Sequence, residues 1–99
     1  MNVMNRKTSG RLLLRLAAKE FQADCPDYEK AFAFNQAAAK LGEPCARYNM
    51  GYLYENGLGI EKDLKKAMYW YEMAGLDGMK GAELKLEELK SRLEGENQE

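Results

Sequence analysis

An internal repeat with a period of 36 residues constrains the fold more than any other feature of the sequence. When residues 27–53 are aligned with residues 63–89, identical residues occupy seven positions. The matched pairs are Asp27/Asp63, Lys30/Lys66, Ala31/Ala67, Ala38/Ala74, Gly42/Gly78, Ala46/Ala82 and Leu53/Leu89. A period near this length is typical of arrays in which each repeat is a helical hairpin. We therefore expect a helical-repeat fold.

Apolar side chains between the glycine and proline residues recur at helical spacing rather than in alternation, which predicts helices and no strands. We expect a single domain over residues 8–94, with flexible ends at 1–7 and 95–99. The domain would consist of two hairpins and a capping helix. The expected helices cover residues 8–23, 27–41, 43–56, 63–75 and 79–94, so that the hairpins span 8–41 and 43–75.

Short acidic residues and glycines mark the ends of these helices. Asp27 and Asp63 each precede a helical run, where a carboxylate accepts hydrogen bonds from the free N–H groups of the first turn. Gly42 and Gly78 follow the second and fourth helices, where a left-handed residue lets the chain turn. The segment 57–62 is expected to form the turn inside the second hairpin.

The absence of histidine excludes several classes of enzyme. Ser-His-Asp hydrolases, Cys-His proteases and histidine-bearing metal sites each need an imidazole. We therefore expect no catalytic site, no metal site and no cofactor. The net charge is −1, without the basicity of a nucleic-acid binder, and no apolar run approaches the roughly 20 residues that span a membrane.

Residues 38–78 carry an ordered pattern of small, aromatic and glycine residues. Its members are Leu41-Gly42, Ala46, Tyr48, Met50-Gly51, Leu53-Tyr54, Gly57, Gly59-Ile60, Asp63, Lys66-Ala67, Trp70-Tyr71, Ala74 and Gly78. This pattern resembles the Sel-one-like repeat (SLR) family, a relative of the tetratricopeptide repeats. Residues 11–41 match it more loosely, with a shorter turn at Asp24-Cys25-Pro26. The resemblance implies an all-α, tetratricopeptide-like α-α superhelix.

The same resemblance implies a non-catalytic protein–protein interaction module, an adaptor or scaffold whose concave surface binds a protein or peptide. Candidate contacts lie at positions that the family pattern leaves variable, and Tyr and Arg are enriched at binding hot spots. These candidates are Arg47, Asn49, Tyr52 and Glu55 on the third helix and Tyr69 on the fourth. As alternatives, Tyr52 fills the seam between the hairpins, and Tyr69 packs against the last helix.

The last expected helix has the features of a cap. An apolar stripe on it can cover the open end of the second hairpin. Glu87 and Lys90 take the places of Gly51 and Tyr54, and charged residues there would not accept another repeat. The stripe consists of Ala82, Leu86, Leu89 and Leu93.

The two cysteines are expected to be free thiols. Cys25 and Cys45 flank the second helix, whose length of roughly 20 Å exceeds the Cα separation of about 7 Å that a disulfide allows. Because the sequence also shows no signal-peptide pattern, we expect a cytoplasmic protein.

The two ends of the chain carry opposite charge. Five basic residues precede the first acidic one, Glu20, whereas residues 83–99 hold six glutamates. This asymmetry leaves open a self-assembling structural subunit, in which the basic first helix meets the acidic cap of another copy; simple solubility is the plainer explanation. A further alternative, drawn from the family, is an immunity or regulatory protein that occludes a bacterial toxin or effector. The basic residues are Arg6, Lys7, Arg11, Arg15 and Lys19.

Overall fold

The computed structural model describes residues 5–97 of the chain, and this part is all-α, with no strand. Short turns separate the helices, as the glycine and proline positions predicted. The helices are α1 (Arg6–Gln22), α2 (Tyr28–Lys40), α3 (Pro44–Asn56), α4 (Leu64–Leu76) and α5 (Lys80–Asn97). All five predicted helices are present, and each boundary lies within three residues of its predicted place.

The ends of the described chain are more helical than the sequence indicated. Helix α1 begins at Arg6 because the Asn5 side chain caps it, accepting a hydrogen bond of 2.8 Å from the Thr8 N–H. Helix α5 continues to Asn97. The rest of the segments predicted to be flexible, 1–4 and 98–99, lies outside the described residues. The expected caps Asp27 and Asp63 are confirmed, since each carboxylate accepts a bond from the N–H three residues later.

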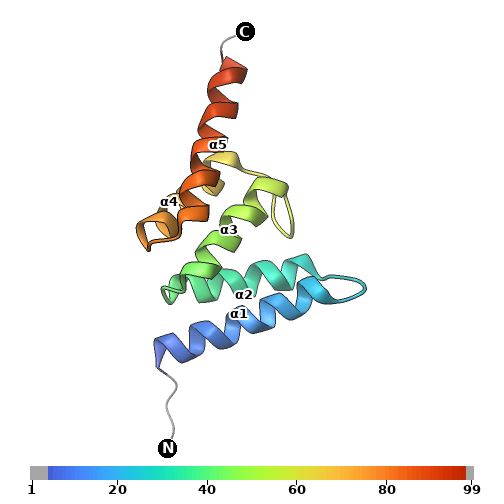
Figure 1. Cartoon of the computed structure of the whole chain (residues 1–99). Helices are drawn as coiled ribbons and strands as arrows, with labels where there is room; N and C mark the ends of the chain where they lie inside the picture. Colours follow the sequence, from blue (N-terminus) through green and yellow to red (C-terminus); the bar gives the residue numbers. More distant parts are fainter. Residues whose placement is uncertain (1–4, 98–99) are drawn as a thin grey trace, which may run out of the picture.

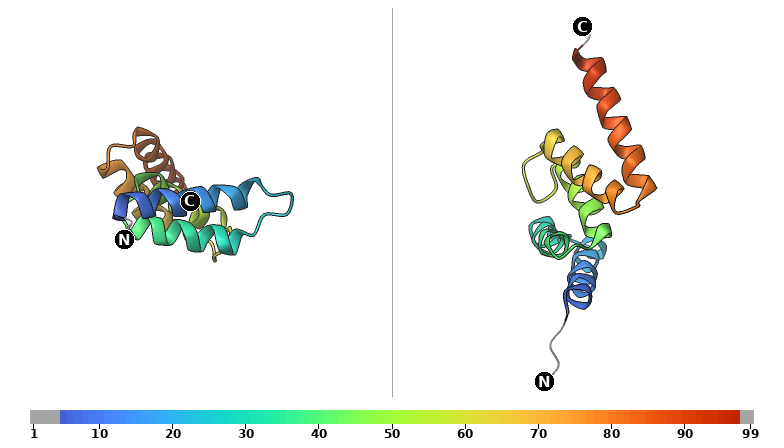
Figure 2. Two further views of the ribbon diagram at one scale, coloured as in Figure 1. Left: turned by 90° about the horizontal axis from the view of Figure 1, so that it is seen from below. Right: turned by 90° about the vertical axis from the view of Figure 1, so that its left-hand side faces the viewer.

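Successive helices pack against one another in chain order, as Figure 1 shows. Helices α1 and α2 form the first hairpin, α3 and α4 the second, and α5 lies against α4. The views in Figure 2 show α5 extending beyond the second hairpin. The resulting molecule is elongated, with extents of 60 × 31 × 17 Å and a radius of gyration of 14.4 Å, against about 13 Å for a compact domain of this length.

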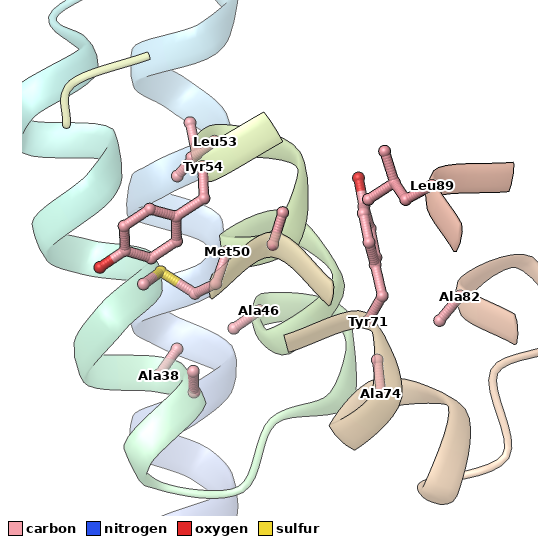
Figure 3. Close-up of a cluster of buried hydrophobic side chains, with 11 residues drawn as sticks. Ala38, Ala46, Met50, Leu53, Tyr54, Tyr71, Ala74, Ala82 and Leu89 are labelled. Carbon is pink, nitrogen blue, oxygen red and sulfur yellow. The ribbon is translucent and has the colours of Figure 1, made fainter. Parts of the chain in front are cut away.

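Alanines make up most of the buried core, which allows the helices to approach closely. The largest fully buried side chains are Tyr71, Met50, Leu53, Leu89 and Asn35. Figure 3 shows Tyr71 of α4 beside Leu89 of α5, so that the core continues from the second hairpin into the last helix. The buried alanines are Ala17, Ala31, Ala38, Ala39, Ala46, Ala67, Ala74 and Ala82.

The turn inside the second hairpin lies against the first hairpin. Gly59 has a φ of +74°, and a Cβ built there would meet the backbone carbonyl of Tyr28 at the start of α2. Only glycine fits both the left-handed backbone and this close approach. The predicted turn at 57–62 therefore also fixes how the hairpins stack.

Helix α5 has the predicted character of a cap. Ala82 and Leu89 of its apolar stripe are fully buried. Glu87 and Lys90 face solvent, with 3.9 Å between Glu87 Oε1 and Lys90 Nζ. The outward face of this helix is therefore charged, as expected of the end of an array.

Candidate partner-binding groove

A groove of about 410 Å³ opens between α1 and α3, the first helices of the two hairpins. Aromatic rings and small polar groups face it, a composition typical of surfaces that bind other proteins. Its volume is large enough for one or two side chains of a partner. The lining residues are Ala18, Phe21 and Gln22 from α1 and Tyr48, Asn49 and Tyr52 from α3.

Two of the five predicted contact residues, Tyr52 and Asn49, come together in this groove. Tyr52 is 44% exposed, so it does not fill the seam between the hairpins. The Asn49 side chain is held in place by Asn35 of α2, which accepts a 3.1 Å hydrogen bond from Asn49 Nδ2. Asn35 is itself fully buried and donates to the Ala31 carbonyl. The groove thus has one exposed aromatic residue and one positioned amide.

The remaining aromatic residues of the groove are fixed by packing. The Tyr48 ring meets the edge of Tyr71, with centroids 5.3 Å apart, and the Phe21 ring meets Tyr28 at 5.8 Å. Edge-to-face pairs of this kind are favourable beyond the area that they bury. A partner therefore encounters rings whose orientation is set before binding, which lowers the entropy cost of association.

Arg47 does not line the groove, although the sequence placed it among the contacts. Its Nη1 lies 2.8 Å from Asp77 Oδ2, and its Nε donates a hydrogen bond of 3.3 Å to the Ala39 carbonyl. These bonds link the C-terminal ends of α2 and α4 to α3. The side chain is 19% exposed, so its position is that of an internal brace.

Glu55 is buried, with an exposed fraction of 8%, and is not available as the sequence analysis expected. Its carboxylate accepts hydrogen bonds from Tyr71 Oη at 2.8 Å, Lys85 Nζ at 3.2 Å and Arg92 Nη1 at 3.4 Å. Because Lys85 and Arg92 belong to α5, this cluster fastens the capping helix to α3. The physical reason for the difference is that α5 supplies two cations for one buried carboxylate.

Burial and the Glu55 carboxylate together raise the pKa of the Tyr71 hydroxyl well above its usual value. Partial burial disfavours the charged form of Lys85, but its hydrogen bond with Glu55 and the attraction to Glu55 and Glu88 outweigh this effect and raise its pKa. Both groups are therefore protonated at neutral pH.

Tyr69 also lies outside the groove. It is 54% exposed on α4, where its ring meets the edge of Trp70 at a centroid distance of 5.2 Å. Tyr69 is therefore accessible to a partner, but α4 does not border the α1–α3 groove.

Sequence reasoning missed the half of the groove that α1 contributes, and also Tyr48. A usable signal was present, because corresponding helices of successive hairpins lie on the same side of a repeat array. Ala18 and Gln22 are four residues apart, which places them on one face of α1. The divergence of the first hairpin from the repeat pattern concealed their correspondence with α3.

The described residues, 5–97, hold no cluster of the side chains that ligate metals. No group of three or more carboxylate or cysteine side chains in this part of the chain could hold a metal ion. Cys25 and Cys45 are free and exposed. None of the helices in residues 5–97 combines the length and the apolar character needed to cross a bilayer.

Comparison with known families gives one family match. The model of the Sel1 repeat matches residues 26–43 and 46–79. The match thus covers α2, α3 from residue 46 onward, α4 and the turns between these helices.

Known proteins show similarity over about half of the chain. The chain is 40% identical over 48 residues to the chitin synthase regulator SKT5 of Saccharomyces cerevisiae. The aligned segment makes up 48% of this chain and 7% of that protein. It is 44% identical over 46 residues to HRD3 of Candida glabrata, an ERAD-associated E3 ubiquitin-protein ligase component. This aligned segment makes up 46% of this chain and 6% of that protein. The chain therefore spans less than a tenth of the length of these relatives.

A solved structure extends the likeness to most of the fold. The crystal structure of a Sel1 repeat protein from Oxalobacter formigenes superposes with a TM-score of 0.75 at 29% identity. The superposition covers 84% of this chain and 65% of that one. It therefore includes more of the chain than the repeat model matches.

Proposed function

Because the chain belongs to the Sel1 repeat family, we propose that it is a non-catalytic adaptor that binds a partner protein in the groove between α1 and α3. The observation that carries this proposal is the exposed Tyr52 above a hollow whose other rings are already fixed. A large, rigid side chain beside a preformed hollow is the arrangement found at binding hot spots.

The relatives support a role in protein binding. The names of these two relatives each refer to another protein: one is a regulator of a chitin synthase and the other is a component of a ubiquitin ligase. This chain shares only a small part of their length, so the proposal takes from them the kind of role and no specific partner. The two free cysteines are in keeping with a cytoplasmic location.

The test is a comparison of two matched variants in affinity capture from a native lysate. Tyr52→Glu introduces a charge in the groove, whereas Tyr69→Glu introduces the same charge at an exposed tyrosine on α4. We expect a stoichiometric partner that Tyr52→Glu loses and Tyr69→Glu retains, confirmed by calorimetric titration of the purified pair. A partner retained by both variants, or lost with Tyr69→Glu alone, would place the binding surface outside the groove.

A second candidate function is self-assembly, and the observation that favours it is the opposite charge of the terminal helices. Helix α1 carries five basic residues before Glu20, and the outward face of α5 is rich in glutamate. Light scattering over a range of protein concentrations at low salt measures this directly. A mass that rises with concentration and falls with added salt supports self-assembly, whereas a monomer throughout contradicts it.

A further inference from the structure

We infer that the segment bound in the groove is acidic, with carboxylates that pair with Arg11 and Arg15 of α1 while a neighbouring apolar side chain enters the hollow beside Tyr52. This inference rests on the proposed function, because it names the chemistry of the segment that the groove accepts. It concerns a part of the surface that the sequence analysis treated only as a basic helix.

The two arginines lie on the side of α1 that borders the groove. Arg11, Arg15, Ala18 and Gln22 follow one another at intervals of three or four residues, which is the spacing of one helix face. Ala18 and Gln22 line the aromatic hollow, and the two arginines line a second hollow, of about 480 Å³, on the preceding turns, together with Thr8 and Leu14. The binding face thus has an apolar half and a basic half.

The charge of the basic half is not used within the described part of the molecule. Arg11 and Arg15 are both exposed, and neither forms an ion pair with any described carboxylate. The two arginines of the second hairpin and the capping helix differ, since Arg47 is paired with Asp77 and Arg92 with Glu55. A guanidinium offers a rigid pair of donors that matches a carboxylate, so two unpaired arginines side by side favour an acidic ligand.

The helix rise sets the spacing that the ligand needs. The distance along α1 from the midpoint of Arg11 and Arg15 to the aromatic hollow is about seven residues, or roughly 10 Å at 1.5 Å per residue. An extended peptide covers this distance in about three residues at about 3.3 Å each. We therefore expect an acidic pair about three residues from a large apolar side chain, or about seven if the ligand is helical.

A displayed library of random twelve-residue peptides, selected on the immobilised full chain, tests the inference. We expect the enriched sequences to combine aspartate or glutamate with an aromatic or large aliphatic residue at this spacing. One enriched peptide is then labelled and titrated by fluorescence anisotropy. Arg11→Glu with Arg15→Glu should weaken its binding at least tenfold, and raising the salt concentration should weaken binding to the unmodified chain.

Lys65→Glu with Lys80→Glu is the matched control. It makes the same change in net charge at exposed lysines near the N-termini of α4 and α5, where glutamate is tolerated in a first helical turn. We expect it to change the affinity less than threefold. Equal losses for the two double variants would mean that overall charge, rather than the arginine pair, attracts the peptide, and this would overturn the inference.

Other outcomes separate the inference from the proposed function. Neutral or basic peptides that bind, and lose affinity with Tyr52→Glu, would leave the groove as the binding site and overturn the acidic ligand. Peptides that bind without regard to Tyr52 would contradict both. If phosphatidylserine vesicles bind and the binding depends on the two arginines, the occupant is a lipid surface. If the chain forms an oligomer that Arg11→Glu with Arg15→Glu disperses, the occupant is a second copy. Either result would overturn the inference of an acidic partner protein.

Discussion

The Tyr71 hydroxyl of α4 donates a hydrogen bond of 2.8 Å to Glu55 Oε1 of α3, and both side chains are buried. The same carboxylate accepts bonds from Lys85 and Arg92 of α5. One acidic group therefore joins three helices. Without these three donors a buried carboxylate would be strongly unfavourable, so the position of α5 depends on this cluster.

The first prediction concerns stability at alkaline pH. Because the pKa of Tyr71 is raised in the folded chain, the unfolded chain releases this proton first, near pH 10. The stabilising contribution is therefore fully present below pH 10 and is lost as the pH rises further, by up to about 1.4 kcal/mol per pH unit. Urea unfolding followed by circular dichroism between pH 8 and pH 11 measures this loss.

Tyr71→Phe is the control for that titration. At pH 7 we expect the variant to be less stable by about 1–2 kcal/mol, since it loses a hydrogen bond to a charged group. Above pH 10 the difference should shrink, because the variant has no hydroxyl to titrate at this position. Lys85 also has a raised pKa and loses its contribution at high pH in both proteins, so some alkaline dependence remains. Parallel curves for the two proteins would contradict the prediction.

The second prediction is that Glu55→Gln loosens the capping helix. The amide oxygen still accepts from Tyr71, but the attraction to Lys85 and Arg92 is lost. These two side chains are 25% and 45% exposed and can turn to water, so we expect a moderate loss of about 1–2 kcal/mol. Thermal unfolding gives the stability, and hydrogen exchange of the α5 amides shows where it is lost.

Glu88→Gln is the matched change for this experiment. Glu88 also lies near Lys85, at 3.6 Å between Oε2 and Nζ, but its side chain is 54% exposed. Exposed pairs contribute little, so we expect a loss below about 0.5 kcal/mol and unchanged exchange in α5. Equal effects of the two substitutions would mean that Glu55 does not hold the cap.

The contrast between fold and groove shows what the sequence could and could not predict. Asp27, Asp63, Gly42 and Gly78 act through local backbone bonds, so their positions were sufficient to place the helix ends. The role of Glu55 depends on two cations that lie 30 and 37 residues away. Such a role follows only from the way that α5 docks.

Only the α3 side of the groove could be predicted from the sequence, because the α1 side depends on how the hairpins pack. Tyr52 and Asn49 lie at variable positions of a well-matched repeat, which marked them as surface residues. Arg47 has an equally variable position, but it forms an ion pair with Asp77 and is therefore not free to bind a partner. The pairing of α1 with α3 depends on the stacking of the hairpins, and the divergent first hairpin gave no repeat pattern from which to infer it.

The third prediction is that Gly51→Ala destabilises the second hairpin. A Cβ at this position would lie 2.6 Å from Cε1 of Tyr71, inside van der Waals contact. The buried ring cannot move aside without breaking its bond with Glu55. We expect a net loss of about 1–3 kcal/mol, because overpacking outweighs the higher helix propensity of alanine.

Gly81→Ala separates packing from propensity. Gly81 lies in α5, where the nearest atom to an added Cβ is Tyr48 Cε2 at 3.9 Å, an ordinary contact. We expect the free energy of unfolding of this variant to rise by up to about 1 kcal/mol, because alanine has the higher helix propensity. Chemical unfolding of both variants measures the two values, and a stabilised Gly51→Ala would show that the Tyr71 ring has room to shift.

The last prediction concerns the contact that stacks the hairpins. Gly59 and Gly42 both have positive φ values, +74° and +90°, so alanine is strained at either position. A Cβ at Gly42 meets nothing within 4 Å, and we expect Gly42→Ala to cost only the backbone strain of about 1–2 kcal/mol. At Gly59 the added carbon also meets the Tyr28 carbonyl, which is backbone and cannot rotate away. Gly59→Ala should therefore destabilise the chain by at least about 1 kcal/mol more than Gly42→Ala, and should increase hydrogen exchange at the start of α2. Equal losses in urea unfolding would mean that the turn does not need its close approach to α2.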